Sequence, residues 1–180
     1  MHRGHVDISH VTGEMLYRLK FTEHTHTVYS GGFWDRMGVP VPDYPYDAPW
    51  VWQVFEDDCP PWVKHTKTLF PWLHHSLVTV NKLMPGRFIA PHQDTLYKLR
   101  KKVEQDGLDV EGMEPQRVNL FLQDRLMGHY FEMEDNAWID YVKGDYSIIK
   151  QDTTHLVANL GYQPRFTMQI TGFAKIEDIK

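Results

Sequence analysis

Residues 146–170 read YSIIKQDTTHLVANLGYQPRFTMQI, which is three short β-type runs separated by turn-forming segments. The same pattern extends back to residue 76, and in all eight runs of this kind are found: 77–80, 87–90, 118–122, 130–133, 138–142, 146–149, 154–157 and 166–170. Credible turns between them are Pro85-Gly86, Asp135-Asn136, Lys143-Gly144-Asp145 and Leu160-Gly161-Tyr162. Eight short strands at this spacing are typical of a sandwich or jelly roll, so we predict a mainly β fold.

In one segment of this β-rich half the apolar residues recur with a different period. In residues 95–106 the apolar residues Leu96, Leu99 and Val103 recur at helical spacing, and Gly107 supplies a stop. We therefore predict a helical insertion between two strands. We interpret its cations as a solvated helix face, with attraction of an acidic substrate as the alternative. These cations are Lys98, Arg100, Lys101 and Lys102.

The first 75 residues are irregular and contain five of the six tryptophans. We expect a short helix over 12–19, an aromatic loop over 31–49, a strand over 50–55, and a helix from Pro60-Pro61 to about Phe70. The high aromatic and low charge content argues against disorder. We expect one domain over residues 1–180, in which an aromatic-rich layer (1–75) packs on a β core (76–174).

Composition excludes several classes of function. The chain of 180 residues has a formal net charge of -5, which gives no excess of positive potential for binding a phosphate backbone. No apolar run is long enough to span a membrane, and the amino terminus lacks the apolar core of a secretion signal. We expect a cytoplasmic protein with neither a nucleic-acid nor a membrane partner. Cys59 is the only cysteine, so a metal would need nitrogen and oxygen ligands.

Three residues of the β-rich half have the chemistry of a metal site. His92 and Asp94 are two positions apart, and on an extended segment such residues project to the same side. His155 follows 63 residues later, at the start of another predicted strand. Two imidazoles and one carboxylate on one face of a metal leave the opposite positions open, as in non-haem Fe(II) oxygenases.

A candidate anion-binding pair follows these residues. Arg165 comes ten residues after His155, and Thr167 lies on the same side of the same predicted strand. The guanidinium can donate two parallel hydrogen bonds to a carboxylate, and the hydroxyl can donate a third.

In these features the chain resembles the Fe(II)/2-oxoglutarate-dependent oxygenases, and within them the aspartyl/asparaginyl β-hydroxylase and free-proline hydroxylase branch. The resemblance covers roughly residues 80–172 and depends on a small set of motifs. These are Pro85-Gly86 followed by Pro91-His92, Arg117-Val118-Asn119, Gly144-Asp145 before Tyr146, and His155, Asn159, Gly161 and Arg165. It implies a double-stranded β-helix, the cupin-like form of the jelly roll, with flanking helices.

The resemblance also implies roles for individual residues. His92, Asp94 and His155 would hold Fe(II), and Arg165 would bind the distal carboxylate of 2-oxoglutarate. Arg117 and Asn119 would lie near the metal-chelating end of 2-oxoglutarate, and Asn81 would assist its distal carboxylate. Thr167 is expected to help Arg165 there because of its place on the same side of the strand.

The implied enzyme is a dioxygenase that uses O2 and forms succinate and CO2. It would hydroxylate an unactivated C–H bond of an amino acid, a peptidyl side chain or another small molecule. Two alternatives stay open: a cupin-like metalloenzyme that does not use 2-oxoglutarate, and a non-catalytic jelly-roll binding domain. The oligomeric state is open as well.

Overall fold

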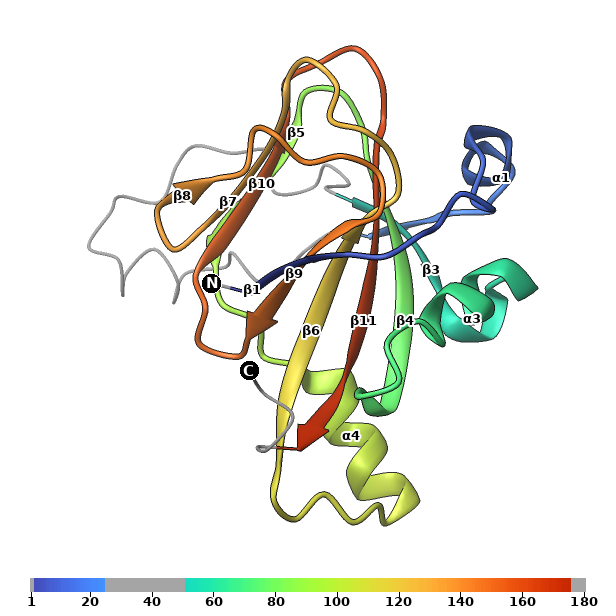
Figure 1. Cartoon of the computed structure of the whole chain (residues 1–180), viewed down its shortest axis with the longest axis vertical. Helices are drawn as coiled ribbons and strands as arrows, with labels where there is room; N and C mark the ends of the chain where they lie inside the picture. Colours follow the sequence, from blue (N-terminus) through green and yellow to red (C-terminus); the bar gives the residue numbers. More distant parts are fainter. Residues whose placement is uncertain (1, 25–50, 176–180) are drawn as a thin grey trace.

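The chain forms two antiparallel sheets, and two of its helices lie on one side of them (Figure 1). A computed structural model describes residues 2–24 and 51–175, so the predicted aromatic loop over 31–49 lies outside the described residues. The large sheet has the order β1 (His2–His5), β9 (Asp145–Lys150), β6 (Met113–Phe121), β11 (Arg165–Lys175), β4 (His74–Leu83), β3 (Val51–Phe55) and β2 (Thr22–His24). The small sheet has the order β5 (Arg87–His92), β10 (His155–Asn159), β7 (His129–Met133) and β8 (Asn136–Ala137).

From β4 onward the chain crosses repeatedly between the two sheets. β4, β6, β9 and β11 belong to the large sheet, whereas β5, β7 with β8, and β10 belong to the small sheet. This alternation, with β11 between β4 and β6 and β10 between β5 and β7, defines the double-stranded β-helix. The predicted fold class is therefore confirmed, and the strands of residues 2–24 and 51–55 extend the large sheet at its two edges.

The large sheet has one apolar face and one polar face, because side chains alternate along each strand. The apolar face is built from the even-numbered residues Val78, Val80, Val118, Leu120, Phe166, Met168 and Ile170, all of which are buried. They pack in one cluster with Leu16 of helix α1 (Gly13–Tyr17) and Val63 of helix α3 (Pro61–Lys67). Figure 1 shows both helices on the side of the large sheet that faces away from the small sheet. Both helices were expected from the sequence.

A second apolar cluster lies between the two sheets. It consists of Phe121, Phe131, Met133, Trp138, Tyr141 and Ile149. The strand predicted over 138–142 is wrong: Trp138 and Tyr141 are three positions apart and both rings are buried in this cluster, which strand alternation does not allow. The β7–β8 hairpin ends at Ala137 instead, and its turn residues Glu134 and Asp135 both have positive φ.

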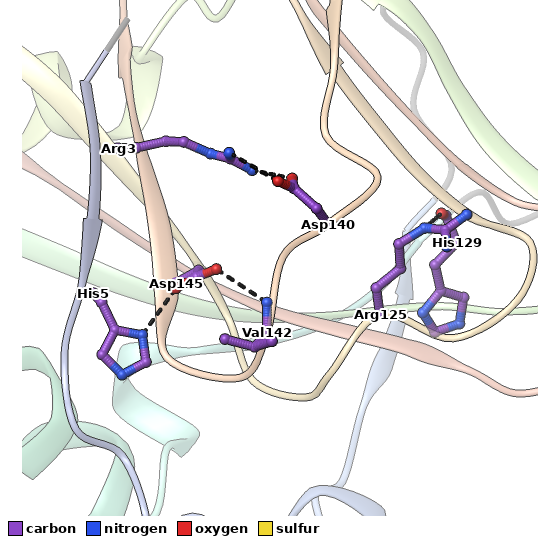
Figure 2. A network of polar contacts seen from close by, with 7 residues as sticks. All are labelled: Arg3, His5, Arg125, His129, Asp140, Val142 and Asp145. Atoms are coloured by element: carbon purple, nitrogen blue, oxygen red, sulfur yellow. Dashed lines mark hydrogen bonds and ion pairs between the residues drawn. The ribbon is translucent and has the colours of Figure 1, made fainter.

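The edge strand β1 is held against the loop that contains these two aromatic residues (Figure 2). Arg3 Nη2 donates to Asp140 Oδ1 at 2.6 Å, and its guanidinium lies 4.0 Å from the Trp138 ring centroid. His5 Nδ1 lies 2.8 Å from Asp145 Oδ1, and the other oxygen of this carboxylate accepts from the Val142 amide. These contacts hold β1 against the loop over residues 138–144.

The predicted insertion is helix α4 (Tyr97–Asp106), which joins β5 to β6. Gly107 ends it in the left-handed conformation, with φ of 60°, as its position in the sequence indicated. Among the described residues, none of the helices has the length and apolar character needed to cross a membrane.

Asn159 joins three segments at the end of β10, and its side chain is completely buried. Its amide nitrogen donates to the carbonyl oxygens of Leu83 and Gln163, at 2.9 and 2.8 Å, and its oxygen accepts from the Gly161 amide.

Asn159→Ala should lower the free energy of unfolding by about 2 to 4 kcal/mol, because it leaves three backbone groups without their partner. Urea denaturation followed by circular dichroism measures this loss. The matched control is Asn136→Ala, whose exposed side chain donates to the nearby Glu134 carbonyl, with an expected change of about 0.5 kcal/mol or less. Equal midpoints for the two variants would contradict the structural role of Asn159.

Candidate metal centre

His92, Asp94 and His155 meet where β5 and β10 pair. His155 is directly opposite His92 in the strand register, and the ring centroids of the two imidazoles are 4.2 Å apart. Asp94 follows the end of β5, with one carboxylate oxygen 3.9 Å from His92 Nε2 and the other 3.7 Å from His155 Nε2. One potential ligand atom from each residue lies within 4.8 Å of the others, which is a grouping that could hold a metal ion.

The imidazole of His155 is oriented for ligation. Its Nδ1 lies 3.1 Å from the carbonyl oxygen of Thr153, which only accepts hydrogen bonds, so Nδ1 carries the proton and Nε2 keeps a free lone pair. Burial of the ring lowers the pKa of His155, against the opposing effect of Asp94. Both features favour the neutral imidazole that binds metals.

Asp94 is fixed by a cation from the opposite sheet. Arg117 Nη1 donates to Asp94 Oδ2 at 2.5 Å, and Arg117 Nε donates to Thr171 Oγ1 at 3.0 Å. Burial by itself would raise the pKa of Asp94, but Arg117 and then the two histidines outweigh it, and the pKa is lowered. The carboxylate is therefore ionised and oriented before any ligand arrives.

A cavity of about 310 Å³ opens beside the three residues and continues between the two sheets. Its lining includes every residue predicted to bind the metal or the cosubstrate: His92, Asp94, His155, Arg165, Thr167, Arg117, Asn119 and Asn81. These side chains come from β4, β6, β10 and β11 and from the end of β5. The polar face of the large sheet is thus one wall of this cavity.

Arg165 lies in the cavity wall, with three aromatic rings near its guanidinium. The residue is 4% exposed, and its guanidinium carbon is 5.5 Å from the Phe121 ring centroid and 6.0 Å from that of Phe131. Its Nε donates to Tyr141 Oη at 3.3 Å, but Nη2 is buried with no hydrogen-bond partner in the described parts of the chain. Burial lowers the pKa of Arg165, and no carboxylate of residues 2–24 or 51–175 forms an ion pair with it.

Neutral polar groups occupy the wall between Arg117 and Arg165. Thr167 pairs in register with Asn81, and Asn119 pairs with Gln169, so these four side chains point to the same face of the sheet. Asn119 is buried, and its Nδ2 has no hydrogen-bond partner within the described ranges. Its amide protons are therefore donors that a ligand in the cavity could satisfy.

Two residues that hold side chains of this wall in place were not singled out from the sequence. Gln53 of β3 donates to Asn81 Oδ1 at 2.7 Å, which fixes the orientation of the Asn81 amide. Tyr141 supplies the hydroxyl that accepts from Arg165. Gln53 lies in a predicted strand, but only the pairing of β3 with β4 shows that it faces the cavity. Tyr141 was assigned to a strand that does not form.

This arrangement combines two chemical capacities in one space. Two imidazole nitrogens and a carboxylate oxygen are suitable ligands for a divalent transition metal. A desolvated guanidinium lacking an acidic partner is suited to a carboxylate or another anion.

No protein-family model matches the sequence, and no curated protein matches it. Solved structures are similar in fold at low sequence identity. A prolyl-4-hydroxylase from Pseudomonas putida matches with a TM-score of 0.45 and 14% identity, over 69% of this chain and 71% of that chain. A predicted oxalate decarboxylase from Thermotoga maritima matches with a TM-score of 0.40 and 15% identity, over 68% of this chain and 79% of that chain. The cupin domain of Cnp3 from Schizosaccharomyces pombe matches with a TM-score of 0.43 and 8% identity, over 73% and 70% of the two chains. The assignment of this chain to the double-stranded β-helix fold stands on its own strand order.

Proposed function

We propose that this protein is an Fe(II)- and 2-oxoglutarate-dependent dioxygenase that hydroxylates an unactivated C–H bond of an amino acid, a peptidyl side chain or another small molecule. The observation that carries the proposal is the buried Arg165 guanidinium, which has no acidic partner among residues 2–24 and 51–175 and lies in the same cavity as the His92, Asp94 and His155 group. A metal centre alone does not require such a cation. A cosubstrate that chelates the metal at one end and has a carboxylate at the other does.

The residues present fit both groups. His92, Asp94 and His155 provide the two-histidine, one-carboxylate donor set of non-haem Fe(II) sites. Arg165 Nη2 is a buried donor without a partner among the residues that the structure describes, and burying an uncompensated charge costs several kcal/mol unless a ligand supplies the opposite charge. A dicarboxylate with its distal group at Arg165 would meet this requirement.

Each polar residue of the site then has a defined role. Bound Fe(II), with 2-oxoglutarate and O2, would supply the oxidising chemistry and yield succinate and CO2. Arg117 keeps Asp94 ionised, and Thr153 keeps the His155 proton on Nδ1. Arg165 and Thr167 would bind the distal carboxylate, with Asn81 held by Gln53 beside them. Asn119 would donate to the metal-chelating end of the cosubstrate.

The apolar residues around Arg165 would exclude water from its charge. Phe121, Phe131 and Tyr141 have their ring centroids within 6.0 Å of the guanidinium carbon. A charge pair in such surroundings is screened much less than in water. The aromatic walls therefore strengthen the binding of a carboxylate that can reach Arg165.

The first test concerns the metal. His92→Ala and His155→Ala should each lose stoichiometric Fe(II), measured by metal analysis after anaerobic loading, because each removes one of three protein ligands. His65→Ala is the matched control, since His65 is exposed on α3 and does not line the cavity, and it should bind Fe(II) like the wild type. Full metal content in both cavity variants would overturn the assignment of this centre.

The second test concerns the cosubstrate. Arg165→Met should weaken 2-oxoglutarate binding to the metal-loaded protein by about 2 to 5 kcal/mol in calorimetric titrations, because the distal carboxylate loses its charged partner. Arg165→Lys should recover only part of the affinity, since it keeps the charge but loses the planar fork.

In the protein without ligand, Arg165→Met should not reduce thermal stability. Replacing an uncompensated buried charge with an apolar side chain of similar length should leave the melting temperature unchanged or raise it. Addition of 2-oxoglutarate should then stabilise the wild type but not Arg165→Met. Wild-type 2-oxoglutarate affinity in Arg165→Met would favour a metalloenzyme that does not use this cosubstrate.

A further inference from the structure

The first turn of α4 places one cation at the cavity, and the other three cations of the insertion have different surroundings. Lys98 lines the cavity, and its Nζ lies 3.2 Å from the centroid of the Phe55 ring of β3. Arg100 donates to Gln151, Lys102 is paired with Asp106, and Lys101 is exposed and does not line the cavity. The predicted solvated face therefore holds for the helix, and Lys98 is exposed as well but also lines the cavity.

Lys98 has no acidic partner in the described parts of the chain. Partial burial lowers its pKa, and no carboxylate acts against this effect. The Phe55 ring contacts one side of the ammonium group, which has three N–H donors. No hydrogen bond from Lys98 Nζ is found among the described residues, so its donors are available to a ligand in the cavity.

Lys98 and Arg165 belong to different ends of the cavity. Phe55, which contacts Lys98, is paired with Thr79 of β4, whereas Arg165 is paired with Leu83. These β4 positions are four residues apart, or about 14 Å along a strand. Arg117, the partner of Asp94, is paired with Thr171 of β11, and Thr171 is paired with Leu77 of β4. Leu77 is two positions from Thr79. Lys98 is therefore near the metal-binding end, and Arg165 is at the far end.

The charges in the cavity leave room for a second anion. Its ionised lining residues are Asp94, Arg117, Lys98 and Arg165, and one negative against three positive charges gives a net charge of two positive. A divalent metal would add two positive charges, and a doubly charged 2-oxoglutarate would cancel only those two. The excess of positive charge that remains favours an anionic substrate over a neutral or cationic one.

We propose that the substrate is a carboxylate, bound through its anionic group to Lys98 at the metal-proximal mouth of the cavity. This inference rests on the proposed function and names its substrate class. Phe55 holds the ammonium group at the mouth, and Lys98 determines specificity by rejecting the corresponding amides. α4 follows Asp94 by only two residues, so the substrate-binding cation and a metal ligand are on one short segment.

The test uses two probes of similar shape, propionate and propionamide, which fit a cavity of this size. The protein is loaded with redox-inert Zn(II) and saturated with 2-oxoglutarate, so that Arg165 is already occupied. Its lysines are reductively methylated with 13C, which preserves their charge, and the Lys98 signal is assigned from its loss in Lys98→Met. Each probe is titrated at constant ionic strength and followed by NMR.

Propionate should shift the Lys98 signal saturably, and propionamide should not. Lys98→Met should weaken propionate binding about tenfold or more, read from backbone amide shifts, because a charge-assisted hydrogen bond is lost. Lys98→Arg should retain most of the affinity, and the exposed control Lys101→Met should match the wild type. Absence of a saturable shift with propionate, equal binding of propionamide, or wild-type affinity in Lys98→Met would overturn the proposal.

This result is separable from that of the proposed function. If 2-oxoglutarate does not bind, the dioxygenase proposal fails, and the same titration is run on zinc-loaded Arg165→Met. Propionate binding that still depends on Lys98 then supports a carboxylate site in a different kind of metalloprotein.

Discussion

Strand alternation in β4, β6 and β11 is the constraint on which the rest of the structure depends. Their even-numbered residues form an apolar face that would be exposed without α1 and α3, and their odd-numbered residues form the polar wall of the cavity. Residues of the described segments 2–24 and 51–73 therefore cover the sheet on its outer side, and Gln53 and Phe55 contribute to the inner side. A shift of one residue in the register of any of these strands would exchange the two faces.

The two arginines of the cavity differ in whether an acidic residue of the described chain compensates their charge. Arg117 is compensated within the chain by Asp94, and this pair keeps a candidate metal ligand charged and in place. Among the described residues, the interactions of the Arg165 guanidinium are with a tyrosine hydroxyl and aromatic rings. A buried cation of this kind lowers the stability of the free protein, and such a cost is understandable where a ligand provides the missing charge.

The sequence predicts the features that depend on local pattern, and it misses those that depend on how distant segments meet. The fold class follows from the β-type runs, seven of which form strands, and α4 and its end at Gly107 follow from apolar spacing and the glycine. His92, Asp94, His155 and Arg165 share one cavity, as their spacing suggested. Tyr141 and Gln53 were missed because their positions depend on the second core cluster and on β3–β4 pairing. The sequence also did not show that Lys98 lines the cavity whereas Arg100 does not, since the position of Lys98 depends on its contact with the ring of Phe55.

The position of β11 has a consequence for how the molecule assembles during synthesis. It is the last described strand in the chain and also lies between β4 and β6, which have no direct pairing with each other. While the ribosome is still producing residues before 165, the two halves of the large sheet lack the strand that joins them. The apolar face of the sheet cannot close over α1 and α3 until β11 emerges, and contacts of such long sequence separation form slowly. A nascent chain stopped before β11 should therefore expose apolar strands to chaperones. It would also lack Arg165, the cation at the far end of the cavity.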